Sequence, residues 1–194
     1  MSTKERIIDA ALQAFSKHGF EGTTLAQIAK NVGIQKPSMY NHFKSKNELF
    51  LLISERITNQ LVTNIQTTAK HYEETDIETR LYAVLKHSCD FIIHEQEGVM
   101  YKRFMLFPPA ELRSNVREIV QAGDQEINQV LHQLFQQGLD EGRLRHIPEQ
   151  MFHSAYYCLL DGLFTESFIY DDSDFQRRFK EAWTVFWYGI SKEC

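Results

Sequence analysis

The chain has little of what would place it in a membrane, in an oxidising compartment or among disordered proteins. It contains only three cysteines, Cys89, Cys158 and Cys194, which are far apart and form no CxxC pair. This usage fits a reducing compartment and predicts neither a disulfide nor a zinc site. We find no run of about eighteen apolar residues and no apolar N-terminal stretch, so we expect no membrane span, no signal peptide and a cytoplasmic protein.

Proline and glycine are also scarce, at four and nine of the 194 residues, and they separate segments whose apolar residues recur every 3.6 positions. This pattern predicts an all-α protein of roughly nine helices without strands. We expect the first two helices to end at Gly19 and Gly33 and the third to run from about Lys36 to Phe43. Ser45 then opens a long helix, and a later helix, from about 112 to 139, should be broken or loosened near Gly123.

Charge is unevenly distributed along the chain. Residues 1–50 contain seven Lys or Arg against four Asp or Glu, a net charge of +3, and because the whole chain carries −5, the remainder carries −8. A basic N-terminal part attached to an acidic body indicates that only the first part would meet a polyanion. The overall pI of about 5.9 is therefore no argument against DNA binding.

The segment from Leu25 to Phe43 meets the physical requirements of a helix-turn-helix. Ile28, Val32 and Met39 can form a shared core, and Gly33 can adopt the left-handed conformation that the turn needs. The apolar stripe from Ile7 to Phe15 supplies the third helix against which such a unit must pack. The second helix of the motif then presents side chains that donate to phosphates or base edges, with few acids among them.

Three segments, TTLAQIA at 23–29, VGI at 32–34 and SMYNHFKSKNEL at 38–49, resemble the N-terminal signature of the TetR/AcrR repressor family. The resemblance covers roughly residues 3–50, about a quarter of the chain. It implies a three-helix helix-turn-helix DNA-binding domain, residues 1–47, followed by a helical effector-binding and dimerisation domain, residues 48–194. One departure is Pro37, where the family usually has a small residue; proline is tolerated in a first helical turn, so it affects the expected base preference rather than the fold.

The resemblance also implies the contacts with an operator in double-stranded DNA. Thr24 and Lys46 would hold phosphates, while Tyr40 and His42 would clamp the DNA backbone. Five residues would face the major groove: Gln35, Lys36, Pro37, Ser38 and Asn41. Two of the phosphate-binding candidates can also serve the fold, because Thr24 is a helix cap and Tyr40 can lie partly in the core.

The last two predicted helices are apolar over more than one face, so they are expected either to be buried on both sides or to form an interface. Because one helix-turn-helix touches too few bases for useful specificity, such domains usually act in pairs, and we predict a homodimer. The alternative is a single thick core within the monomer. The candidate interface residues are Tyr156, Leu160, Phe164, Phe179, Trp183 and Phe186.

The middle of the chain is rich in bulky aromatic residues, which can leave a pocket between helices. We expect an apolar or aromatic small-molecule effector to bind there, with Phe91 and Phe104 as candidate pocket residues. A filled core accounts for any one of these rings equally well, so sensing rests chiefly on the family resemblance. No cofactor and no metal are expected.

Two other classes of function compete with a regulator. An enzyme could use His87, Asp90 and His94, which share one helical face, but the two histidines lie two turns apart, roughly 10 Å along the axis, which suits a single metal ion poorly. A helical protein-interaction adaptor without specific DNA binding would leave the basic N-terminal part unexplained. The sequence therefore predicts a non-enzyme: a DNA-binding transcriptional repressor released from its operator by a small ligand.

Overall fold

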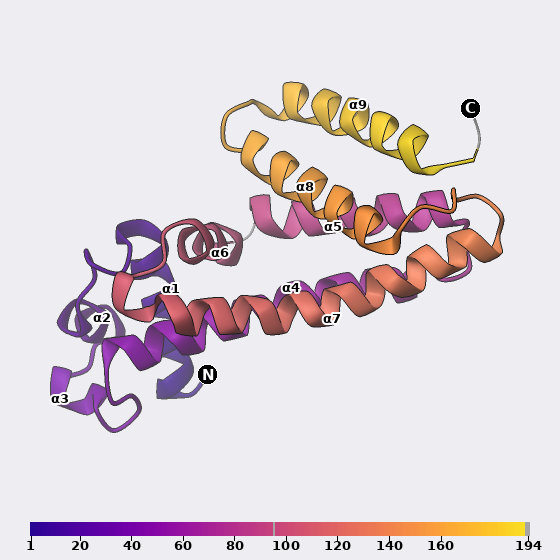
Figure 1. Ribbon diagram of the computed structural model, residues 1–194. Helices are drawn as coiled ribbons and strands as arrows, with labels where there is room; N and C mark the ends of the chain where they lie inside the picture. Colours follow the sequence, from indigo (N-terminus) through magenta and orange to yellow (C-terminus); the bar gives the residue numbers. More distant parts are fainter. Residues whose placement is uncertain (95, 193–194) are drawn as a thin grey trace. The chain divides into compact units, whose positions relative to one another are not determined.

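The computed structural model describes residues 1–94 and 96–192, except for the side chain of His94, and it is helical as predicted. Nine α-helices and one short 3-10 helix occur among these residues, and Figure 1 shows them as separate coiled ribbons. They are α1 Thr3–His18, α2 Leu25–Val32, α3 Lys36–Met39, α4 Lys46–His71, α5 Ile77–His94, α6 Gln96–Leu106, η1 Ala110–Leu112, α7 Arg113–Asp140, α8 Glu149–Glu166 and α9 Asp172–Ile190. No strand occurs in the described part, and Leu144 and Ser191 form one isolated antiparallel bridge there.

The chain divides into two compact units. Unit 1 comprises Met1–Gln60 and His94–Gly123, and unit 2 comprises Leu61–Ile93 and Asp124–Cys194. The predicted DNA-binding domain, residues 1–47, lies wholly within unit 1. Helices α4 and α7 each contribute their first part to unit 1 and their second part to unit 2.

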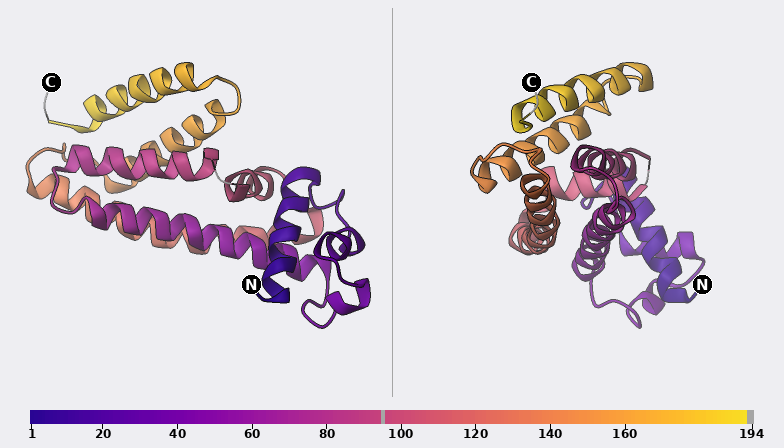
Figure 2. Two further views of the ribbon diagram at one scale, coloured as in Figure 1. Left: turned by 180° about the vertical axis from the view of Figure 1, so that it is seen from behind. Right: turned by 90° about the vertical axis from the view of Figure 1, so that its right-hand side faces the viewer.

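The core of unit 1 is built around α1. Its N-terminus carries a capping box in which Ser2 and Glu5 exchange hydrogen bonds, and its buried stripe includes Ile7 and Phe15, both 0% exposed. Helix α6 lies against α1, as both views in Figure 2 show. Ser16 Oγ strengthens this contact by donating to the main-chain carbonyl of Gln96 at 3.4 Å.

Unit 2 is a bundle in which α8 and α9 form an antiparallel hairpin (Figure 1). The ring of Tyr82 on α5 meets Phe179 and Trp183 on α9 edge to face, with centroids 5.5 and 5.3 Å apart. Phe135 on α7 stacks on Phe152 of α8 at 5.0 Å. These aromatic contacts join α5 to α9 and α7 to α8 within the apolar core of unit 2.

Two expectations about helix boundaries are wrong. The helix expected to break near Gly123 is continuous from Arg113 to Asp140, because Gly123 is buried and tertiary packing outweighs the roughly 1 kcal/mol that glycine costs in a helix. The third helix is shorter than expected: α3 ends at Met39, and residues 40–42 continue as turns. There the amides of His42 and Phe43 both donate to the Met39 carbonyl at 3.0 Å.

Candidate DNA-binding surface

Helices α1, α2 and α3 form the predicted helix-turn-helix. Thr24 caps α2: its hydroxyl accepts from the Gln27 amide at 3.3 Å, and the Gln27 side chain accepts from the Thr24 amide at 2.8 Å. At the other end Gly33 is left-handed, with φ 78°, and turns the chain toward α3. The buried side chains of Ile28 and Met39 are 0% exposed, so α2 and α3 share one core with α1.

The predicted base-reading residues lie on the outer side of this unit. Gln35, Lys36, Pro37 and Asn41 are exposed, and Ser38 is half-buried. Pro37 occupies the first turn of α3, where its missing N–H leaves no helical hydrogen bond unmade. Four of these five side chains are therefore open to solvent on one short segment, and their contacts with bases stay a prediction.

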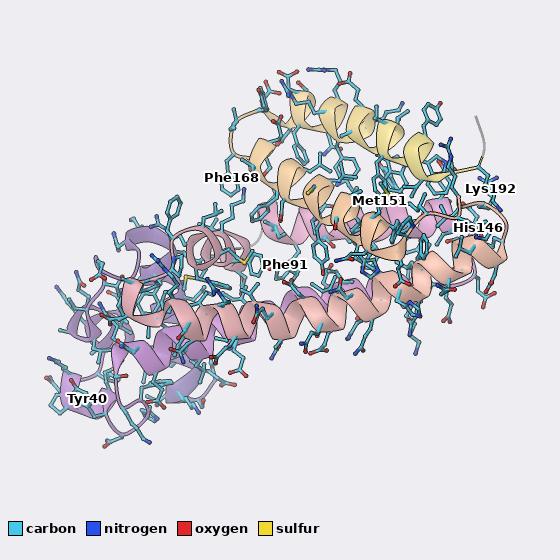
Figure 3. All side chains as sticks on the ribbon, in the orientation of Figure 1. Tyr40, Phe91, His146, Met151, Phe168 and Lys192 are labelled. Carbon is cyan, nitrogen blue, oxygen red and sulfur yellow. The ribbon has the colours of Figure 1, made fainter. Side chains whose placement is uncertain are left out.

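The predicted phosphate-binding residues differ in their surroundings. Tyr40 is 52% exposed and projects from the end of α3 (Figure 3), whereas His42 is half-buried beside the ring of Phe43. Thr24 is exposed while it caps α2. Tyr40 and Thr24 are thus open to solvent and His42 is partly covered, and the phosphate contacts of all three stay a prediction.

Lys46 is engaged within the protein itself. Its ammonium donates to the main-chain carbonyls of Phe20 at 2.8 Å and Thr23 at 3.1 Å, and it lies 3.9 Å from the centroid of the Phe20 ring. Because an ammonium has three N–H donors, one remains for a phosphate. Lys46 thus fixes the loop that leads into the capped N-terminus of α2.

Two residues that position the helix-turn-helix were not identified as such from the sequence. Thr23 is 1% exposed, and its hydroxyl lies 2.7 Å from the Gly19 carbonyl and 3.1 Å from that of Ala14. Arg6 on α1 donates from Nη2 to the Val32 carbonyl at 2.5 Å and so holds the C-terminal end of α2. Nothing in the sequence signals the Arg6 contact, since its partner lies 26 positions away.

The candidate interface residues lie mostly inside the protomer. Tyr156, Leu160, Phe164, Phe179 and Trp183 are at most 7% exposed, and only Phe186 is half-buried. An open groove of about 620 Å³ follows the other face of the α8–α9 hairpin. The residues along its length include Cys158, Leu159, Gly162, Ala182, Val185 and Phe186.

The two candidate effector residues belong to different units. Phe104 lies on α6 in unit 1, is 0% exposed and contacts Tyr101 edge to face at 5.2 Å. Phe91 lies near the C-terminal end of α5 in unit 2 and is half-buried (Figure 3). Their role as pocket residues stays a prediction.

The candidate metal and thiol residues have ordinary surroundings where they are described. Asp90 pairs with Lys86 one turn earlier on α5, and the side chain of His94 lies outside the described residues. No group of three His, Cys, Asp or Glu side chains in the described part could hold a metal ion. Cys89 is buried and Cys158 is exposed, and Cys194 is not among the described residues.

A histidine cluster joins α7 to α8 in unit 2. Glu149 Oε1 lies 2.8 Å from His132 Nδ1 and 3.5 Å from His153 Nε2. Burial lowers the pKa of His153, the Glu149 carboxylate opposes this effect, and His132 adds to it. His153 is therefore held in its neutral form to lower pH than an exposed histidine.

Comparison with known proteins identifies the family of this chain. Residues 7–53 match the model of bacterial regulatory proteins, tetR family. IcaR of Staphylococcus aureus strain Newman, a negative transcriptional regulator of the biofilm operon icaADBC, is 32% identical over 146 residues, which cover 75% of this chain and 74% of IcaR. The chain belongs to the tetR family. The resemblance noted in the sequence is thereby confirmed.

Other relatives of this tetR-family chain match it over a shorter length or at lower identity. The transcriptional activator FasR of Mycolicibacterium smegmatis is 32% identical over 93 residues, which span only 42% of FasR and 48% of this chain. Among solved structures, a complex of SmeT with triclosan is 25% identical, covers 100% of this chain and 93% of SmeT, and gives a TM-score of 0.74. FadR of Bacillus subtilis with stearoyl-CoA, 18% identical, covers 96% and 98% of the two chains with a TM-score of 0.76, which confirms the fold.

Proposed function

We propose that this protein is a homodimeric transcriptional repressor that binds an operator in double-stranded DNA and is released by a small apolar or aromatic effector. The observation that carries the proposal is the group of exposed side chains Gln35, Lys36, Pro37, Tyr40 and Asn41, held on a capped helix-turn-helix in the basic part of the chain. The family membership supports this function. Repression is favoured over activation because the match to IcaR, a negative regulator, spans most of both chains, whereas the match to FasR does not.

Binding to the DNA that flanks the protein's own gene tests the proposal, because such regulators often control neighbouring genes. We expect tight, salt-sensitive binding in a gel-shift assay and a footprint confined to one short sequence. Asn41→Ala should relax selectivity at one base pair by about 1–3 kcal/mol, because it removes a side chain suited to a base edge. Asn31→Ala, at an exposed position on α2, is the matched control. Equal affinity of the wild type for flanking and scrambled duplexes would favour the adaptor function instead.

The partner in the dimer is proposed to cover the α8–α9 groove. The exposed side chains along it include Cys158 and Val185, the latter 73% exposed. A Cβ added at Gly162 would meet nothing within 4 Å, so packing inside the protomer does not explain a glycine that costs helix stability. Close approach of a second helix does explain it. The buried rings of Phe179 and Trp183 then support this face from inside instead of forming it.

The effector is proposed to be apolar or aromatic. SmeT was solved with triclosan and FadR with stearoyl-CoA, and both ligands have large apolar parts. A ligand of this kind would bind by burying apolar surface among aromatic side chains such as Phe91. To release the protein from its operator, the effector needs only to bind the operator-free arrangement of the protein more tightly than the operator-bound one.

We propose no catalytic activity and a cytoplasmic location. The tetR family is a family of regulators, and a regulator of transcription must reach DNA. No helix in the described residues is long and apolar enough to cross a membrane. Hydrolytic or redox turnover of an effector by the purified protein would contradict the first part of this proposal.

A further inference from the structure

Unit 1 contains a cleft beside the helix-turn-helix, between α1, α4 and α6. Its volume is about 140 Å³. Three aromatic rings, Phe15, Phe20 and Phe50, form one wall, with centroids 5.0 to 6.1 Å apart. Met100 of α6 and Phe107, the residue directly after α6, complete the apolar lining. A ligand in the cleft would therefore contact aromatic rings and a thioether.

Arg103 of α6 is the one charged residue among those that line the cleft. Its Nη2 donates to the Lys17 carbonyl at the end of α1, at a long 3.4 Å, and the side chain is exposed. A Cβ at Gly19 would lie 3.1 Å from Nη1, so the glycine leaves room for the guanidinium beside the cleft. Because a guanidinium has five N–H donors in a planar fork, most of them are available to a carboxylate.

We propose that this cleft binds a single aromatic ring carrying a carboxylate. An apolar cavity of about 150 Å³ in another protein holds benzene, so the cleft has the right size for one ring and little more. The ring would lie among the phenylalanines and Met100, and the carboxylate would pair with Arg103. Phe107, 80% exposed at the end of α6, would lose part of its exposed apolar surface to the ligand.

Neither candidate effector residue, Phe91 or Phe104, is among the residues that line this cleft, and the test of the cleft uses no operator DNA. Benzoate is the probe, and benzyl alcohol, which has the same ring without the charge, is the control ligand. The 194-residue protein is labelled at its five methionine methyl groups. We expect benzoate to shift the Met100 resonance saturably, because a bound ring would lie beside it, and to leave those of Met39 in the α3 core and Met151 on α8 unchanged.

Substitution of Arg103 tests the charge recognition. Arg103→Gln should weaken benzoate binding about tenfold, to the level of benzyl alcohol, because it removes a charge-assisted pair. Lys102→Gln removes the same charge from the neighbouring position, which does not line the cleft, and should bind benzoate like the wild type. Arg103→Lys keeps the charge but loses the planar fork, so its benzoate affinity should lie between those of the wild type and Arg103→Gln. This variant also tests the site if Arg103→Gln fails to fold.

Three results would overturn the proposal. They are the absence of a saturable Met100 shift, benzoate affinity that survives Arg103→Gln, and an equal loss in Lys102→Gln. None of them bears on operator binding, so the regulator function and this site can fail separately.

Discussion

At the scale of single residues, Lys46 shows how one side chain can serve both the fold and DNA binding. The family resemblance implies a phosphate contact, and the structure adds two hydrogen bonds to the carbonyls of Phe20 and Thr23. These bonds fix the segment just before Thr24, whose hydroxyl caps α2. Lys46 would thus support DNA binding in two ways: through its own phosphate contact, and by fixing the loop that positions Thr24.

Lys46→Ala should therefore weaken binding to operator and scrambled DNA alike. We expect the slope of log affinity against log salt to fall by about one per protomer, since one phosphate contact is lost. The free energy of unfolding should also fall by about 1 kcal/mol, because two carbonyls lose their donor. Lys70→Ala, an exposed lysine in the last turn of the same helix, is the matched control. An unchanged salt slope combined with lower stability would make Lys46 purely structural.

At the scale of elements, the α8–α9 hairpin has two apolar faces with different tasks. Phe179 and Trp183 belong to the inner face and contact Tyr82 of α5, so a charge placed there would disrupt unit 2 itself. Val185 belongs to the outer face and lines the groove. A test of dimerisation must therefore use the outer face.

Val185→Glu should produce a folded monomer. The one cation among the residues that line the groove, Arg178, already pairs with Glu166 at 2.8 Å, so an added carboxylate would be costly to bury there. We expect dimer dissociation to become easier by at least about a hundredfold. Sedimentation velocity measures the state, and circular dichroism should show unchanged helix content. Gln176→Glu adds the same charge on α9 away from the groove and should remain dimeric. A wild type that is monomeric at micromolar concentration would contradict the interface.

At the scale of the whole molecule, His153 links stability to pH. Because burial lowers its pKa in the folded state, the unfolded chain takes up a proton first as the pH falls below the ordinary histidine value of about 6.5. The folded protein should therefore lose stability as the pH falls from 6.5 toward the lower folded pKa. Asp124, whose pKa is raised by burial and by Asp161, contributes in the opposite direction at lower pH.

Urea unfolding at about pH 7.5 and about pH 5.5 measures how the free energy of unfolding depends on the protonation of His153. Both pH values lie above the ordinary carboxylate range. His153→Gln should show a smaller loss of stability between the two than the wild type, because glutamine does not titrate. His146→Gln, at an exposed position in the α7–α8 loop, should behave like the wild type. Identical losses in all three proteins would exclude a role for His153.

Release of the operator is also a property of the whole molecule. Two recognition segments must meet successive major grooves about 34–36 Å apart, so an effector needs only to favour another spacing. Linkage then requires operator DNA to weaken effector binding by the factor by which the effector weakens operator binding. A ligand found by thermal-shift screening that binds free and operator-bound protein equally is not the inducer.

Phe91→Ala and Phe104→Leu locate the effector site. Because the two residues belong to different units, each substitution tests its own candidate position. The one that lines the pocket should weaken binding of a true inducer, and both should leave operator affinity intact, since neither residue lies in the segment 35–41. Leucine is chosen at position 104 instead of alanine because Phe104 is fully buried in unit 1, where a smaller side chain would disturb the core more. An inducer whose affinity survives both substitutions binds elsewhere.

The sequence by itself determined the helical architecture and predicted the DNA-reading segment, because both depend on local chemistry. The 3.6-residue period, the capping residues Ser2 and Thr24 and the left-handed Gly33 act within a few positions of themselves. Gln35 to Asn41 could likewise be recognised from adjacent residues.

Only the tertiary structure decided which face of each helix is buried and which long-range partners a side chain has. Packing kept α7 continuous through Gly123, buried Phe179 and exposed Val185 on the same helix, and brought Lys46 to carbonyls more than twenty positions earlier. It also placed Arg103 beside Gly19 and the three phenylalanines. These outcomes depend on contacts between distant segments, whose free energies exceed the local preferences from which a sequence is interpreted.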